Sequence, residues 1–105
     1  VGLYAANNVA TADVLGLAAS LSNPEDPDTL VDDLHQLLLG LPVSAQVRAY
    51  HKAILLNNLP LPSYWTLAWD TYVNNPTDPI IKGEVETRLK VLLHVMMQME
   101  EYQLM

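Results

Sequence analysis

Apolar residues recur most regularly in the last third of the chain, at steps of three and four that place them on one face of an α-helix. They are Val85, Leu89, Leu92, Met96 and Met99. Asp78 and Pro79 precede this run, and a capping acid followed by proline is a common helix start. The pattern predicts a helix from residue 79 to about residue 101, with Glu84 and Arg88 spaced as a stabilising pair.

Two earlier helices are predicted before the middle of the chain. A weak apolar pattern over residues 9–21 predicts a short helix with Thr11 as its cap. A stronger pattern begins at Pro27, where Asp26 is expected to accept hydrogen bonds from the free N–H groups of the first turn. That helix is expected to end at Gly40, because glycine readily takes the left-handed conformation of a helix end.

The middle of the chain predicts two more helices. Ser44 is a favourable cap for one that stops at Asn57 and Asn58, just before a proline-rich turn. The other runs from about residue 63 to residue 73 and carries Trp65, Trp69 and Tyr72 at helical spacing. Proline and asparagine therefore separate short helices along the whole chain.

The fold class predicted from these patterns is all-α: a small bundle of four to five antiparallel helices with a long C-terminal helix. Residues 1–27 are interpreted as an N-terminal segment that continues from a larger parent, and residues 28–105 as a C-terminal helical domain. The predicted core consists of Leu34, Leu37, Leu38, Val47, Ile54, Trp65, Trp69, Val85, Leu89, Leu92 and Met96.

Composition narrows the classes of function. The chain has 105 residues, and its five Lys and Arg against twelve Asp and Glu give a net charge of −7. A nucleic-acid partner is not expected, because phosphate binding needs a basic surface. The absence of cysteine excludes disulfides and thiolate metal sites. The apolar runs are too short for a membrane span.

The histidines are the main candidates for chemistry. His35 follows Asp32 by three residues, which is interpreted as an exposed helix pair or, alternatively, as a base oriented by a carboxylate. His51 is expected to be half-buried and hydrogen-bonded, and His94 to lie on the surface. No cluster or metal-ligand spacing is evident, so no catalytic residue, metal or cofactor is predicted. A hydrolase or metal site completed by segments outside the chain stays an alternative.

Two groups of residues are candidates for binding. Tyr64, Trp65 and Trp69 would suit a groove for a carbohydrate or a peptide, although aromatic residues at helical spacing more often lie in a core. The last helix is apolar on more than one side, so an uncovered apolar patch is predicted there as a protein interface. The residues of this second group are Val91, Val95 and Leu104.

Three segments carry a resemblance to a known family. The first begins Asp28-Thr29-Leu30-Val31-Asp32-Asp33-Leu34 and continues through Leu39. The second is Tyr64-Trp65-Thr66-Leu67-Ala68-Trp69-Asp70-Thr71-Tyr72 with the Asn-Pro-Thr-Asp-Pro turn after it. The third is the ending from Arg88-Leu89 to Met99-Glu100-Glu101-Tyr102-Gln103-Leu104-Met105. Over about residues 28–105 the chain resembles the C-terminal region of the bacterial domain-of-unknown-function family eighteen hundred, especially its Bacteroidetes-like members.

The resemblance implies a mostly helical, exported parent protein whose biochemical role is not established, and it implies no functional residue in this chain. The sequence as a whole favours a non-catalytic interaction or scaffold piece. Its expected partner is the remainder of the parent protein or another protein subunit. A small-ligand binding module with an aromatic groove stays the alternative.

Overall fold

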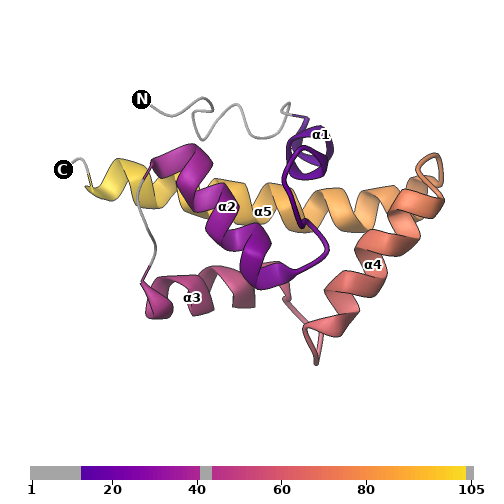
Figure 1. The fold of residues 1–105 in the computed structure, drawn as a ribbon, viewed down its shortest axis with the longest axis horizontal. Helices are drawn as coiled ribbons and strands as arrows, with labels where there is room; N and C mark the ends of the chain where they lie inside the picture. Colours follow the sequence, from indigo (N-terminus) through magenta and orange to yellow (C-terminus); the bar gives the residue numbers. More distant parts are fainter. Residues whose placement is uncertain (1–12, 41–43, 104–105) are drawn as a thin grey trace.

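The computed structural model describes residues 13–40 and 44–103, and every regular element within them is a helix (Figure 1). The all-α prediction is confirmed. In chain order the helices are α1 (Val14–Ala19), α2 (Pro27–Leu39), α3 (Ala45–Leu55), α4 (Ser63–Asn74) and α5 (Pro79–Gln103).

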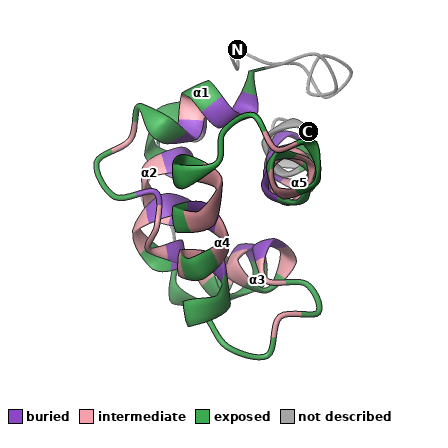
Figure 2. Ribbon diagram, turned by 90° about the vertical axis from the view of Figure 1, so that its right-hand side faces the viewer, coloured by how far each residue is buried: buried purple, intermediate pink, exposed green. Residues whose placement is uncertain are grey.

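The long C-terminal helix is the spine of the molecule. At about 1.5 Å per residue its 25 residues extend roughly 37 Å, close to the 41 Å longest dimension of the protein. Helices α1, α3 and α4 pack against α5, and α2 packs on α3. Figure 1 shows α3 beside α5 and running in the opposite direction, while α1 crosses α5 steeply; Figure 2 shows α5 nearly end-on.

Most of the predicted helix ends are observed. Ser44 accepts a hydrogen bond from the Val47 N–H at 3.2 Å, and Asp78 accepts from the first turn of α5. Gly40 ends α2 with φ of 67°, the left-handed conformation expected there.

The cap of α2 differs from the prediction. Asp26 occupies the cap position, but its carboxylate accepts a hydrogen bond from the hydroxyl of Thr29 at 2.6 Å. The expected bond from Asp26 to the backbone is therefore wrong, because a nearby side-chain donor takes its place.

The first helix begins later than predicted. Its cap is Asp13, whose carboxylate accepts from the Gly16 N–H at 3.0 Å, and its helical residues start at Val14. A Cβ at Gly16 would contact the Asp13 carboxylate directly, so the glycine leaves room for this cap. Thr11, the predicted cap, lies outside the described residues.

The core lies between α5 and the four shorter helices. Its buried apolar residues are Val14, Leu15, Ala18, Leu30, Val31, Leu34, Leu38, Leu55, Trp65, Trp69, Val85, Leu89, Leu92, Leu93, Met96 and Met97. Three residues predicted for the core are not in it: Val47 and Ile54 are half-buried, and Leu37 is 44% exposed. On α2 the buried face is centred on Val31, Leu34 and Leu38, which leaves Leu37 at its edge.

Two hydrogen bonds tie the loop before α2 to α4. The indole Nε1 of Trp65 donates to the Pro24 carbonyl at 2.9 Å, and the hydroxyl of Thr66 donates to the Glu25 carbonyl at 2.8 Å. Pro24 is itself buried. The loop therefore closes one end of the core and holds the register of α4.

Candidate functional site

A groove with a mostly apolar lining lies between α4 and α5. It encloses about 440 Å³, and its walls come from the turn before α4, from α4 itself and from the first two turns of α5. The residues that line it are Leu59, Tyr64, Leu67, Ala68, Thr71, Ile80, Ile81, Glu84 and Val85. Ile80 is 83% exposed, and Leu67 and Tyr64 are exposed as well. Large apolar side chains therefore stand uncovered along both walls.

The groove exists because α4 is apolar on two sides. Trp65 and Trp69 point into the core, where their ring centroids lie 6.1 Å apart. Tyr64, Leu67 and the residues one turn further follow a second stripe at steps of three and four, which faces the groove. A helix that packs by one face only leaves its other face to solvent or to a partner.

The predicted ligand residues therefore separate. Tyr64 lines the groove, whereas Trp65 and Trp69 are 0% and 4% exposed and belong to the core. Among the predicted interface residues, Val91 is 48% exposed and Val95 is half-buried, while Leu104 lies outside the described residues. The groove residues on α5, Ile80 above all, were missed because the helical stripe of that segment draws attention to its buried face.

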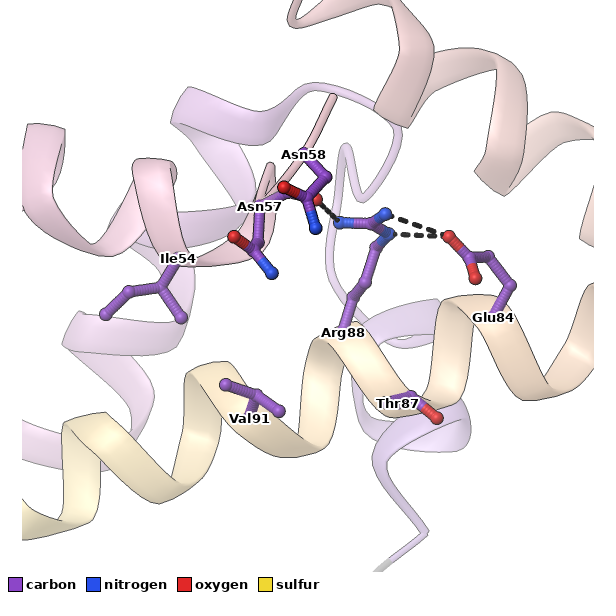
Figure 3. A pocket seen from close by; sticks show the side chains of 7 residues that line it. All are labelled: Ile54, Asn57, Asn58, Glu84, Thr87, Arg88 and Val91. Atoms are coloured by element: carbon purple, nitrogen blue, oxygen red, sulfur yellow. Dashed lines mark hydrogen bonds and ion pairs between the residues drawn. The ribbon is translucent and has the colours of Figure 1, made fainter. Parts of the chain in front are cut away.

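A second, smaller pocket of about 160 Å³ lies where the C-terminal end of α3 meets α5 (Figure 3). Its residues are Ile54, Asn57, Asn58, Glu84, Thr87, Arg88 and Val91. The Arg88 guanidinium donates to the carbonyls of Leu55 and Asn57 at 3.1 and 2.6 Å and pairs with Glu84 at 2.9 Å. Because these bonds use most of its donors, Arg88 acts as a cap for α3 rather than as a ligand-binding group.

Two buried histidines meet between α2 and α3. His35 is 2% exposed and His51 is 0% exposed. The Nε2 atom of His35 lies 2.6 Å from Nδ1 of His51, and the two ring centroids are 4.7 Å apart. The hydrogen-bonded environment predicted for His51 is confirmed, but its side chain is fully buried rather than half-buried. The exposed interpretation of His35 is wrong, and so is the expectation that the histidines do not cluster, because the contact joins residues of different helices.

Burial controls the protonation of this pair. Two effects together lower the pKa of His51 to about 4. The larger is the loss of water on burial, and the smaller is the charge of a protonated His35 nearby. Burial also lowers the pKa of His35, although the neighbouring Asp32 carboxylate opposes the effect. The Nε2 atom of His51 is buried and makes no hydrogen bond to the described residues. Both rings are therefore neutral at pH 7.

Ion pairs flank the histidines. Asp32 on α2 accepts from Arg48 on α3 at 2.7 Å, and Lys52 on α3 lies 3.2 Å from Asp28 on α2. These partners are partly exposed, so each pair contributes little on its own. Together they set acidic residues of α2 opposite basic residues of α3 along the same helix contact as His35 and His51.

The described residues include no group of three or more acidic or histidine side chains placed to hold a metal ion. His35 and His51 supply two nitrogens already in hydrogen-bond contact, whereas structural metal sites use about four ligands. His94, the remaining histidine, is exposed, and its Nε2 atom lies 3.1 Å from Nε2 of Gln98. The surface position predicted for His94 is confirmed.

Comparison with known proteins identifies no relative of this chain. No family model, no curated protein and no solved structure matches the chain. Among the described residues, no helix has the length and apolar character needed to cross a membrane.

Proposed function

We propose that this chain is a helical protein-interaction module whose α4–α5 groove binds the apolar face of an amphipathic helix from a partner protein. The observation that carries the proposal is the mostly apolar lining of the groove, in which Tyr64, Leu67 and Ile80 are exposed. Single exposed apolar residues are ordinary on a soluble protein, but a hollow lined on both walls by them is typical of a binding surface.

The dimensions of the groove suit a helix. Its α4 wall extends from Tyr64 to Thr71, which corresponds to two helical turns or about 10 Å. A partner helix that lies along this wall presents anchors at steps of three, four and seven residues, which is the usual spacing of a helix bound in a groove. Burial of one leucine-sized anchor contributes about 2 kcal/mol, so two or three anchors support a weak to moderate complex.

Charge narrows the chemistry of the partner. Glu84 is the carboxylate among the groove residues, although it already pairs with Arg88, and the whole chain has a net charge of −7. A partner helix with Lys or Arg beside its apolar anchors is therefore attracted to this surface, and an acidic one is repelled. The proposed occupant is an amphipathic helix with basic flanks.

A carbohydrate ligand is less well supported. Sugars require several convergent polar groups, and the groove offers few. The Thr71 hydroxyl is already donated to the Leu67 carbonyl at 2.7 Å, and the Glu84 carboxylate accepts from Arg88. Tyr64 alone of the three predicted aromatic residues faces the hollow.

The wider setting of this module stays a prediction. The resemblance to family eighteen hundred suggests that the partner helix comes from the remainder of an exported parent protein or from another subunit. Binding in the α4–α5 groove is compatible with either source, because both would present an apolar helix face.

The proposal is tested with a labelled peptide of about 18 residues that carries Leu at the anchor spacing and Lys elsewhere. Fluorescence anisotropy measures its binding to the unmodified chain, to Ile80→Ser and to Val91→Ser. Both positions are exposed and apolar, but Ile80 lines the groove and Val91 does not. We expect Ile80→Ser to weaken binding about tenfold and Val91→Ser to have little effect, since only the first removes apolar contact area.

A peptide with Glu in place of Lys is the charge control, and it is expected to bind more weakly. Equal losses for Ile80→Ser and Val91→Ser, or no binding of the basic peptide, would refute the proposal. Sedimentation of the chain alone tests the remaining occupant: self-association that Ile80→Ser abolishes would make a second copy, rather than a partner helix, the natural occupant.

A further inference from the structure

The contact between His35 and His51 leaves room for one hydrogen atom between the two rings. Their facing nitrogens are 2.6 Å apart, a distance that fits one N–H donor and one acceptor. Two neutral rings satisfy this arrangement, because each carries a single N–H and one of these lies between the rings. Two protonated rings do not, because both facing nitrogens would then carry hydrogen.

We infer that the His35–His51 pair is a pH-sensitive latch that holds α2 on α3 while at least one ring is neutral and releases it when both rings are protonated. The first added proton makes one ring a cation, which still donates to the neutral partner. The second proton turns that acceptor into a donor. The hydrogen bond is then lost, and two positive charges stand in a site from which water is excluded.

The surrounding charges determine the order of these steps. Asp32 favours a proton on His35, although its carboxylate also holds Arg48. Lys52, next to His51 in sequence, is engaged with Asp28 across the same helix contact.

The charged groups on the neighbouring helix are paired with each other. On α5, which packs against α3, Arg88 pairs with Glu84. The exposed ring of Tyr50 lies against His51, with centroids 5.4 Å apart.

His51 is therefore the second ring to be protonated. Among the described residues no carboxylate raises its pKa, and its Nε2 is buried without a hydrogen bond. Its pKa of about 4 places the release in acid, well below neutral pH. The latch is closed at pH 7 and opens as pH falls toward 4. The apolar core consists of tryptophan, methionine and aliphatic residues, which do not titrate.

The experiment combines two measurements on the unmodified chain between pH 7 and pH 4. Nitrogen-15 NMR of the imidazoles follows the tautomer and protonation of each ring, and amide hydrogen exchange, corrected for its intrinsic pH dependence, follows each helix. We expect exchange in α2 and α3 to accelerate about tenfold or more as His51 is protonated, while α4 and the adjoining part of α5 stay protected.

The matched control is the double variant His35→Leu with His51→Leu, which keeps Asp28, Asp32 and their basic partners. A buried polar pair replaced by apolar residues of similar size is often tolerated. This variant is expected to keep α2 and α3 protected at low pH, and His94→Gln is expected to behave like the unmodified chain.

Equal acid-induced exchange in the double variant would assign the effect to the carboxylates and overturn the latch. Acceleration of all helices together would show global unfolding instead and would also overturn it. If the double variant does not fold, the unmodified chain still decides: protonation of both rings with α2 and α3 still protected would exclude the latch.

Discussion

Arg88 illustrates how one side chain acts on a distant part of the sequence. It lies on α5, and its guanidinium donates to two carbonyls at the end of α3, more than thirty residues earlier. Asn58 follows with φ of 67°, so the chain turns sharply there and leaves those carbonyls without helical partners. The arginine supplies the missing donors and joins α3 to the spine.

Replacement of Arg88 by Met should lower the free energy of unfolding by about 1–2 kcal/mol, because two carbonyls lose a charged donor. Urea denaturation of the variant measures the loss. Arg48→Met is the matched control, because the Arg48 guanidinium pairs with the Asp32 side chain rather than with backbone carbonyls at a helix end. A smaller loss is expected for it. Equal losses would show that Arg88 contributes only as a partner of Glu84.

At the scale of elements, the ends of the helices are determined locally. Ser44, Asp78 and Gly40 occupy the positions expected from their side-chain chemistry and backbone freedom. Which face of α4 is buried, by contrast, depends on a neighbouring helix. Spacing alone indicates both the tryptophan stripe and the stripe of Tyr64 and Leu67, and the position of α5 decides which of them is covered.

Substitution of two glycines by alanine tests how far the local backbone conformation determines stability. Gly40 adopts φ of 67°, whereas Gly83 lies inside α5 with nothing within 4 Å of an added Cβ. Gly40→Ala should lower stability by about 1 kcal/mol, because alanine is strained in the left-handed region. Gly83→Ala should raise stability by roughly 0.5–1 kcal/mol, because alanine favours the helix and restricts the unfolded chain. Thermal unfolding of both variants checks the opposite signs, and a shift in the same direction would contradict the assignment.

At the scale of the whole molecule, α5 joins α1, α3 and α4 around one core, and α2 completes it by packing on α3. Leu92, at the middle of this helix, is 0% exposed, and α1, α3 and α4 all pack on α5. Part of the apolar surface outside this core lines the α4–α5 groove, where Tyr64, Leu67 and Ile80 are exposed. The same helix thus organises the core and forms one wall of the proposed binding surface.

Leu92→Ala should destabilise the protein by about 3 kcal/mol, through lost apolar contact and the cavity left behind. Leu37→Ala should cost less than about 1 kcal/mol, because that side chain is 44% exposed. Fluorescence of Trp65 and Trp69 and far-ultraviolet circular dichroism would follow both variants during denaturation. Comparable losses for the two leucines would mean that Leu37 belongs to the core after all.

The sequence by itself determined the helices, most of their ends and the buried face of α5. These features depend on interactions within a few residues: caps, the restricted backbone of proline, and apolar spacing along one helix. It also indicated that the two tryptophans belong in the core, because their spacing places them on one stripe with Tyr72.

Only the tertiary structure decided which residues of different helices meet. His35 and His51 are sixteen positions apart, and nothing local brings their rings within hydrogen-bond distance. Leu37 shares the apolar pattern of α2, yet it is left at the edge because α2 packs on α3 through a face that includes His35. Ile80 and Tyr64 form one groove because α4 and α5 pack side by side. Contacts of this kind follow from the angles at which helices pack, and apolar spacing within a single helix does not specify those angles.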